Sequence, residues 1–175
     1  MAKKALFVIA FRGFKDPEYF IPKGILESAG VKVFTASTEK GTALGDDGGQ
    51  AEVDFTIDES KISDFDAIAF VGGPGMSLNL DNENFQKAAK EAFEKGKIVS
   101  AICIAPVVLA KSGILKGRKA TVWSAPMNKQ AVKILKENGA DYEEKKVVED
   151  GSVVTACGPS AAEDFGKALV RKIKD

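Results

Sequence analysis

One stretch near the middle of the chain, residues 97–113, constrains the fold more than any other. Residues 97–102, Lys-Ile-Val-Ser-Ala-Ile, form a short apolar run of the kind found in strands that are covered on both faces. The apolar residues 107–110 continue as a helix, which Gly113 ends. Because a strand covered on both faces leads directly into a helix, the stretch predicts a sheet flanked by helices.

Cys103 lies at the turn between this strand and this helix. Ala101 and Ala105, two places to either side, are small enough for a sharp bend of the nucleophile-elbow type, and Pro106 fits the first helical turn. Free N–H groups at a helix N-terminus favour a thiolate, so we expect the pKa of Cys103 to be lower than that of a free cysteine. The alternative is an inert thiol, since free cysteine is among the most buried residue types.

The other segments alternate between strand-like and helix-like patterns. Strands are expected at residues 4–11, 31–36, 66–71, 120–123, 145–148 and 153–156, and helices at residues 16–30, 82–96, 127–138 and from 160 onward. Residues 38–54, with four glycines, indicate a β-hairpin or an irregular excursion. Helix-sized crossovers predict a mainly parallel sheet with helices on both faces, and no linker or repeat divides residues 1–175, which we expect to form one domain.

Three helix starts carry capping signals. Asp16 can cap the first helix, and Asp81 or Asn82 can cap the helix at 82–96. Ser160 and Glu163 have the spacing of a capping box at the start of the last helix.

One edge of the predicted sheet gathers the candidate ligand-binding segments. The strand at 66–71 ends in Gly72-Gly73-Pro74-Gly75, and glycine turns bring backbone N–H groups close to a ligand. An ordinary tight turn is the commoner explanation, and an oxyanion hole facing Cys103 is the functional one. Ligands of parallel sheets bind at the carboxyl ends of the strands, where this turn, Cys103 and the loop after the first strand all lie.

The absence of histidine excludes several kinds of site. A chain of 175 residues without histidine contains no Cys-His or Ser-His-Asp machinery and no usual zinc or iron site, so proton transfer falls to a carboxylate, water or the thiol. Basic and acidic residues balance at 25 each without a basic cluster, which argues against a nucleic-acid binder or a membrane-binding face.

The N-terminus and the cysteines indicate a cytoplasmic protein. The apolar stretch that ends by Phe11 is too short to span a membrane and lacks a signal-cleavage pattern. Two cysteines, Cys103 and Cys157, fit a reducing compartment, although the sequence leaves a disulfide between them open.

Four groups of residues, taken together, form a family pattern. They are Asp16-Pro17-Glu18, Gly72-Gly73, Ala101-Ile102-Cys103, and the tail from Glu149-Asp150-Gly151 to Thr155-Ala156-Cys157-Gly158-Pro159. The pattern resembles the DJ-1/PfpI superfamily, which includes PfpI-type intracellular cysteine peptidases, glyoxalase-III-like proteins and deglycases. The resemblance covers nearly the whole chain. It implies the fold of class I glutamine amidotransferases, a three-layer αβα sandwich with a flavodoxin-like, mainly parallel sheet and a nucleophile elbow, assembled as a homodimer or larger homo-oligomer.

The resemblance also implies roles for four residues. Cys103 takes the position of the reactive nucleophile, Glu18 that of the glutamate hydrogen-bonded to it, and the N–H groups of Gly73 and Ile104 those of the oxyanion hole. A carboxyl group buried beside a thiolate would have a raised pKa, so its protonated form could donate a hydrogen bond or a proton. Without the resemblance, Glu18 would be explained as a solvated carboxylate that stabilises the helix dipole.

Three positions depart from the superfamily's pattern. Peptidase-like members have histidine directly after the cysteine, where this chain has Ile104, and other members bring one from the loop that here reads Ser124-Ala125-Pro126. Cys157 replaces the arginine that is common before the late Gly-Pro. The departures disfavour peptidase activity, remove an anion-binding group and predict a more apolar pocket.

Three functions follow, in order of preference. The first is a thiol enzyme without cofactor or metal, glyoxalase-like or deglycase-like, in which Cys103 attacks a small carbonyl compound and Glu18 moves the proton. The second is a non-catalytic oxidative-stress sensor or chaperone-like protein, in which an oxidant converts Cys103 to a sulfenic or sulfinic acid and Cys157 could act as the resolving thiol. The third, a cysteine peptidase or amidase, is disfavoured by the missing histidine.

Overall fold

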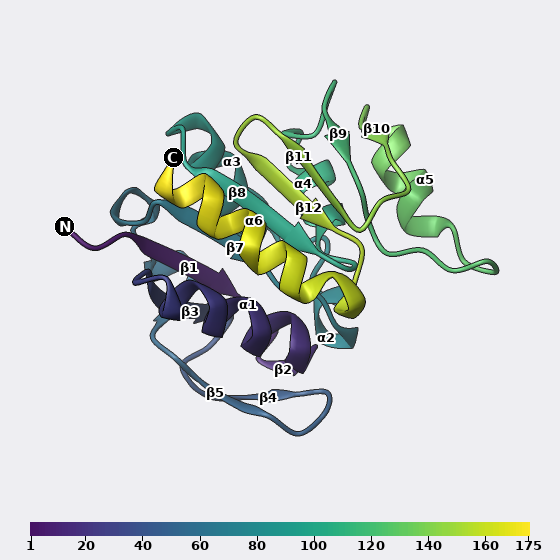
Figure 1. Cartoon of the computed structure of the whole chain (residues 1–175). Coiled ribbons are helices and arrows are strands. Elements are labelled where there is room, and N and C mark those ends of the chain that lie inside the picture. Colours follow the sequence, from purple (N-terminus) through teal and green to yellow (C-terminus); the bar gives the residue numbers. More distant parts are fainter.

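A central sheet of seven strands organises the computed structural model, which covers residues 1–175 (Figure 1). In spatial order the strands are β11 (Val147–Asp150), β12 (Val153–Ala156), β8 (Ile98–Ile102), β7 (Ala67–Phe70), β1 (Lys4–Val8), β3 (Lys32–Ser37) and β6 (Phe55–Thr56). Neighbouring strands are parallel except β11, which runs antiparallel to β12. The predicted parallel sheet is confirmed, and the expected C-terminal hairpin forms its antiparallel edge.

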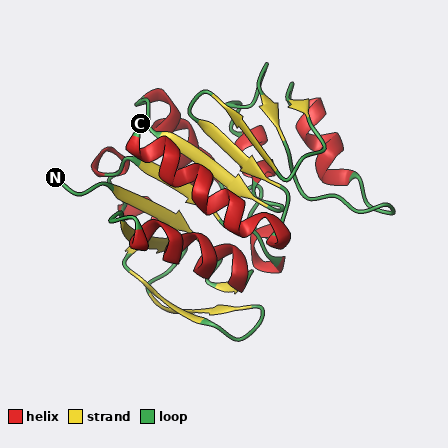
Figure 2. Cartoon of the chain, in the orientation of Figure 1, coloured by secondary structure: helices red, strands yellow, loops and turns green.

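Helices cover both faces of this sheet (Figure 2). On one face lie α1 (Asp16–Ser28) and α6 (Ala162–Lys174), and on the other lie α3 (Glu83–Glu94), α4 (Pro106–Lys111) and α5 (Gln130–Glu137). The remaining short pieces are α2 (Pro74–Ser77) and the 3₁₀ turns η1 (Ile57–Glu59), η2 (Ile62–Asp64) and η3 (Pro159–Ala161). The architecture is the expected three-layer αβα sandwich. No helix of the chain combines the length and the hydropathy that a membrane-spanning segment requires.

Alternate residues of β1 pack into two separate core clusters, one beneath each helical layer. Leu6 and Val8 belong to the cluster that contains α3 and α4, whereas Ala5 and Phe7 belong to the cluster that contains α1 and α6. All four side chains are at most 1% exposed. Successive side chains of a strand point to opposite faces, so a continuous apolar run is what a strand buried on both faces requires.

Two smaller sheets complete the fold. In the first, β2 (Arg12–Phe14) pairs with β4 (Gly41–Gly45), which pairs antiparallel with β5 (Gln50–Val53) and confirms a hairpin within residues 38–54. The second joins β9 (Lys119–Ala120) to β10 (Asp141–Tyr142).

The strand expected at 120–123 is wrong beyond Ala120, because the N–H groups of the next residues form hydrogen bonds outside the β9–β10 pair. Thr121 N–H donates to the hydroxyl of Thr155 (2.9 Å), and Trp123 N–H donates to the carbonyl of Cys103 (2.8 Å).

Asp16 fastens the β4–β5 hairpin instead of capping α1. The helix begins at Asp16 itself, and its carboxylate accepts hydrogen bonds from the N–H groups of Asp47 (2.9 Å) and Gly49 (2.7 Å) in the hairpin turn. The predicted cap is therefore wrong, and the same carboxylate ties the turn to the first strand–helix junction.

Of the other predicted helix starts, the one at Asn82 is confirmed and the two that follow along the chain are wrong. Asn82 caps α3 as predicted, since its side chain accepts from the N–H groups of residues 84 and 85. Ser160 and Glu163 form no capping box, because a 3₁₀ turn over 159–161 precedes α6. α5 begins three residues later than expected, because residues 125–128 form a turn that is closed by two backbone hydrogen bonds between Ala125 and Asn128.

Candidate active site around Cys103

Cys103 forms the predicted elbow between β8 and α4. Its φ is 65°, and it is the one residue other than glycine with positive φ. The backbone holds this conformation from both sides: the Cys103 N–H donates to the carbonyl of Ala156 (2.9 Å), and its carbonyl accepts from the N–H of Trp123 (2.8 Å). Ala101 and Ala105 are fully buried beneath the bend. Backbone conformations of this kind are sparsely populated and cluster at functional sites.

Glu18, Gly72 and Cys103 meet at one point. Glu18 is fully buried in the first turn of α1. A Cβ atom added to Gly72 would lie 2.6 Å from Cβ of Cys103 and 2.6 Å from Oε1 of Glu18. Only glycine fits there, because any side chain would displace the thiol or the carboxyl group. The structure therefore brings together two of the residues that sequence reasoning selected.

Burial raises the pKa of Glu18 from an ordinary 4.5 to about 7. The approach of the Cys103 thiol, the backbone of Gly72 and the charge of Lys15 offset this only in part. Neither carboxyl oxygen has a hydrogen-bond partner of ordinary geometry. The carboxyl group is thus able to carry a proton at neutral pH.

The surroundings also raise the pKa of the Cys103 thiol, so the lowered pKa expected from the sequence is wrong. Burial is the largest cause, followed by the negative charge of Glu18 and the interaction with its carboxyl group, and the N–H of Ile104 opposes the rise only in part. α4 has six residues, and its dipole is small beside these effects. The thiol therefore keeps its proton near neutral pH, and the carboxyl group of Glu18 is the neighbouring group that can take it.

Two backbone N–H groups without a backbone acceptor lie beside the elbow. The N–H groups of Gly73 and Ile104 have no backbone acceptor, and both residues line the same cavity as Cys103. Gly73 has a φ of 121°, and a Cβ atom there would lie 2.5 Å from the carbonyl oxygen of Gly13. The turn is fixed further by the N–H of Lys15, which donates to the carbonyl of Gly72 (3.0 Å).

The Cys103 cavity has a volume of about 460 Å³. Its lining consists of Lys15, Glu18, Asp46, Gly73, Pro74, Ser77, Cys103, Ile104, Trp123, Asn128 and Pro159. Ile104 and Trp123 provide apolar walls, but the expectation of an apolar pocket is wrong in part. The ammonium group of Lys15 pairs with the carboxylates of Asp46 (3.5 Å) and Asp47 (3.3 Å) at this cavity.

Sequence reasoning missed the polar side of the cavity. Asp46 belongs to the β4–β5 turn, which lies far along the chain from Lys15 and is brought over the site by the carboxylate of Asp16. A Cβ atom at Gly49 would collide with both Asp16 and Phe20, so this turn requires the glycine. The glycines beside Asp46 and Asp47 were the signal in the sequence for a tight turn there. Their spacing did not predict that the hairpin would pack beside Cys103.

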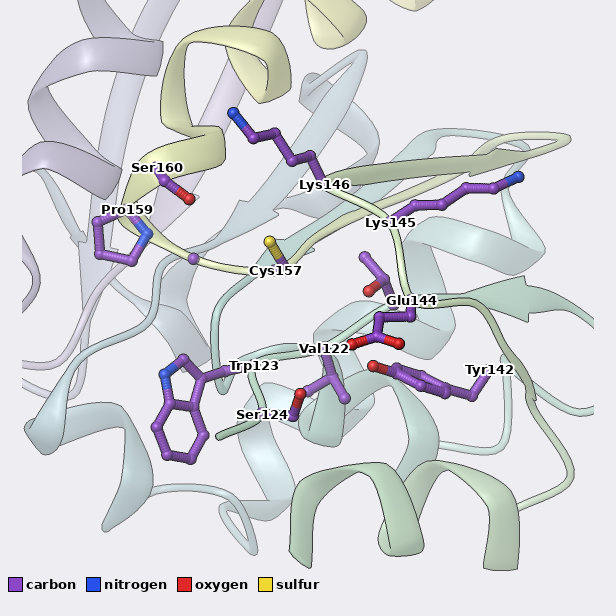
Figure 3. A pocket seen from close by; sticks show the side chains of 12 residues that line it. Val122, Trp123, Ser124, Tyr142, Glu144, Lys145, Lys146, Cys157, Pro159 and Ser160 are labelled. Atoms are coloured by element: carbon purple, nitrogen blue, oxygen red, sulfur yellow. The ribbon is translucent and has the colours of Figure 1, made fainter. Parts of the chain in front are cut away.

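Cys157 lines a different cavity, of about 480 Å³ (Figure 3). This Cys157 cavity is formed by Thr121, Val122, Trp123, Ser124, Tyr142, Glu144, Lys145, Lys146, Cys157, Gly158, Pro159 and Ser160. Trp123 and Pro159 line both cavities, which are therefore neighbours. Ile102 pairs with Ala156 in the sheet, so the two cysteines follow adjacent strand ends, and both are free, half-buried thiols. No group of three or more potential metal ligands converges anywhere in the chain.

The chain is similar to known proteins over nearly its whole length. The model of the DJ-1/PfpI family matches residues 3–172. An uncharacterized protein of Methanocaldococcus jannaschii is 45% identical over 172 residues, 98% of this chain and 82% of that protein. Deglycase PfpI of Pyrococcus furiosus is 32% identical over 171 residues, 98% of this chain and 99% of that protein. The crystal structure of a ThiJ/PfpI domain protein from Brachyspira murdochii superposes with a TM-score of 0.94 at 35% identity, covering 99% of this chain and 97% of the other.

Proposed function

The chain belongs to the DJ-1/PfpI family, and from this premise we propose that it is a cofactor-free thiol enzyme that acts on small carbonyl compounds, as its deglycase-named relatives suggest. One observation carries the proposal. A cysteine in a strained elbow lies against a buried carboxyl group whose pKa is about 7, beside two backbone N–H groups without backbone acceptors. Nucleophile, proton carrier and oxyanion donors are the parts that addition to a carbonyl requires.

The first step is the addition of sulfur to an aldehyde carbon, for example in an α-oxoaldehyde such as methylglyoxal. The carboxylate form of Glu18 takes the proton of the Cys103 thiol while sulfur forms the C–S bond and the π electrons of the C=O bond move to oxygen. The N–H groups of Gly73 and Ile104 donate to that oxygen. Glu18, which now carries the thiol proton, gives this proton to the oxygen, and a hemithioacetal results.

The second step uses Glu18 as a base. Its carboxylate takes the proton from the carbon that carries sulfur and returns it to the neighbouring carbon, while the hydroxyl proton moves from the first oxygen to the second. The hemithioacetal thereby becomes a thioester, which water cleaves to a 2-hydroxy acid and the free thiol. The sum is one water added to one oxoaldehyde, with no external oxidant or reductant.

A raised pKa suits Glu18 to both steps. A general acid–base is most effective when its pKa lies near the working pH, because both protonation states are then populated. A solvated glutamate with a pKa near 4.5 would be too weak a base to take the thiol proton. This chemistry needs no imidazole, in agreement with a chain that has none.

The proposal is tested by following methylglyoxal and lactate by NMR with the purified protein. We expect lactate to form, and Cys103→Ser to abolish the reaction. If Cys103 bound methylglyoxal covalently but no lactate formed, the thiol would only remove the aldehyde and would not catalyse its conversion. Consumption at the same rate by wild type and Cys103→Ser would sink the enzyme proposal.

A redox role is the second candidate, favoured by the adjacent strand ends of the two cysteines. A peroxide would oxidise Cys103 to a sulfenic acid and be reduced to the alcohol or water. The Cys157 thiol would then displace the sulfenic oxygen as water and form a disulfide, which an external dithiol would reduce. The test is to treat the protein with one equivalent of peroxide and to measure its intact mass by mass spectrometry. A mass lower by two hydrogens would support Cys157 as the resolving thiol. Addition of oxygen to the same extent in wild type and Cys157→Ser would rule this role out.

Peptidase or amidase activity ranks below both candidates because no histidine can assist the thiol.

Family membership also leads us to propose a homodimer or larger homo-oligomer. Sedimentation velocity at micromolar concentration tests this, and a monomer there would contradict it.

A further inference from the structure

Trp123, the single tryptophan of the chain, lines the Cys103 cavity without a partner for its ring. It is half-buried, and no aromatic pair or cation–π contact within the chain includes it. In Figure 3 the indole ring points away from Tyr142 and Glu144, which line the Cys157 cavity but not the Cys103 cavity. Aromatic side chains bury a large area in a rigid shape, so the ring of Trp123 offers a ligand of the Cys103 cavity a surface to pack against.

Apolar side chains stand directly beside the groups proposed to react. The N–H of Trp123 donates to the carbonyl of Cys103 (2.8 Å), which fixes the tryptophan to the elbow. Ile104 follows Cys103 in the chain, Pro74 follows Gly73, and both line the same cavity. Each of these apolar walls is therefore attached to the nucleophile or to an oxyanion donor. A substituent of the reacting carbonyl group meets apolar surface within a few bonds of the sulfur.

The charges of this cavity disfavour an anionic substrate. The ammonium group of Lys15 already pairs with the carboxylates of Asp46 (3.5 Å) and Asp47 (3.3 Å). A carboxylate or phosphate group on the substrate would add a further negative charge beside these two aspartates and beside Glu18, which lines the same cavity. An uncharged substituent leaves the pairs of Lys15 undisturbed.

The size of the cavity indicates a substrate larger than methylglyoxal. Its volume of about 460 Å³ lies within the range of about 300–1,000 Å³ that is typical of pockets for drug-sized ligands. A three-carbon oxoaldehyde would leave most of this space, and the apolar walls, to water. A ring attached to the same oxoaldehyde would displace that water, which favours binding because apolar surface is removed from water.

We infer that the site prefers uncharged oxoaldehydes that carry an aromatic group, and that Trp123 selects them by packing against this group. The inference rests on the proposed function, from which it takes the reacting aldehyde and the chemistry. Phenylglyoxal, in which a phenyl group replaces the methyl group of methylglyoxal, is the simplest such compound. The addition of one water converts it to mandelate, in the same way as methylglyoxal gives lactate.

The role of Trp123 is tested by the ratio of two kcat/KM values, for mandelate formation from phenylglyoxal and for lactate formation from methylglyoxal. Taking the ratio cancels general damage to the catalytic groups, and comparing variants cancels the intrinsic reactivity of the two compounds. Trp123→Ala should lower the ratio roughly tenfold, mainly through KM, and Trp123→Phe should restore most of it. Tyr142→Ala, which removes an aromatic ring from the Cys157 cavity, should leave the ratio unchanged. Equal ratios in wild type and Trp123→Ala would overturn the inference.

Binding is tested without catalysis by mandelamide and lactamide, two uncharged amides that differ in the same way and contain no aldehyde. Each is used to protect Cys103 from alkylation by iodoacetamide, which is followed by mass spectrometry. Mandelamide should protect at a roughly tenfold lower concentration than lactamide in wild type and Trp123→Phe, and the difference should disappear in Trp123→Ala. The same difference in Trp123→Ala as in wild type would contradict a role of the indole ring.

The two tests also separate this inference from the proposed function. If neither oxoaldehyde were converted but mandelamide protected Cys103 selectively through Trp123, the enzyme proposal would fail and the aromatic site would stand. If both oxoaldehydes were converted at a ratio that Trp123→Ala did not change, the enzyme proposal would stand and the aromatic site would fail.

Discussion

Cys103 and Cys157 follow directly after two residues that are paired in neighbouring parallel strands, Ile102 and Ala156. Both thiols are free and half-buried. Even so, Cys103 has a left-handed backbone and lies against a buried carboxyl group, whereas Cys157 lies beside the cation Lys146. The comparison teaches that a place at the carboxyl end of a strand brings a side chain to the ligand-binding edge, while backbone conformation and the nearest charge decide its chemistry.

The adjoining cavities repeat this contrast. The Cys103 cavity holds Lys15 between two carboxylates, and the Cys157 cavity holds Lys146 without a partner. In the first cavity the cation is thus neutralised by carboxylates, whereas in the second the ammonium group of Lys146 and the carboxylate of Glu144 both lack an ion pair. Single substitutions test the side chains that distinguish the two thiols.

The largest expected effect comes from exchanging each sulfur for oxygen. Cys103→Ser should lower kcat/KM for methylglyoxal by at least about 10³-fold, because a hydroxyl group without a histidine base is a poor nucleophile. Cys157→Ser should change it by less than about threefold, since it touches no reacting atom. Initial rates of oxoaldehyde consumption measure both, with thermal unfolding as a check on the fold. Similar losses in both variants would mean that the thiols are equivalent.

The next largest effect concerns the proton carrier. Glu18→Gln keeps the size of the side chain but cannot accept a proton, so kcat should fall by roughly 10²-fold or more, the usual worth of a general acid–base. The pH–rate profile should also lose the inflection near pH 7 that the pKa of Glu18 produces. An unchanged profile would assign that inflection to another group and remove Glu18 from the mechanism.

The same variant should change how stability depends on pH. The pKa of Glu18 is about 7 in the folded protein and near 4.5 when unfolded, so the folded state binds more protons between these values. The contribution of Glu18 is therefore fully present below pH 4.5 and declines as pH rises to 7, by up to about 3 kcal/mol. Urea unfolding of wild type and Glu18→Gln at pH 5 and pH 8 measures it. The wild type should lose more stability than the variant, and equal losses would contradict a buried carboxyl group.

A smaller effect is expected at the contact between thiol and carboxyl group. Gly72→Ala places a methyl group against Cys103 and Glu18 and should lower the free energy of unfolding by roughly 1–3 kcal/mol, as overpacking does. Gly24→Ala makes the same change in α1, where nothing lies within 4 Å, and should raise stability by up to about 1 kcal/mol. Equal effects of the two substitutions on chemical denaturation would show that the site is loosely packed.

Sequence alone was sufficient for the sheet and the elbow because their signals are local. The apolar runs of β1, β7 and β8 are buried on both faces, and Ala101 and Ala105 leave room for the bend at Cys103. The contact of Glu18 with Cys103 could be predicted from the family resemblance, which supplied a pairing across the chain that no local pattern contains.

The charges of the site could not be predicted in the same way. The pKa of Cys103 depends on burial and on a carboxylate from another element, and these outweigh the helix terminus that the sequence displays. Asp16 was expected to cap its own helix, yet it binds a distant turn and so delivers Asp46 to the cavity. Long-range contacts of polar side chains depend on how loops fold over the sheet, and residue spacing does not encode that path.

The smallest expected effect tests whether the charge contrast belongs to each cavity or to the protein as a whole. Asp46→Asn removes one of the two carboxylates beside Lys15, so the rate of iodoacetate relative to iodoacetamide at Cys103 should rise about twofold. The same ratio at Cys157 should stay constant, because Asp46 does not line that cavity. Asp58→Asn changes the net charge equally from an exposed position on η1 and should affect neither thiol. If Asp46→Asn and Asp58→Asn raised the ratio equally at both cysteines, net charge rather than cavity lining would govern access, and the distinction between the two cavities would fail.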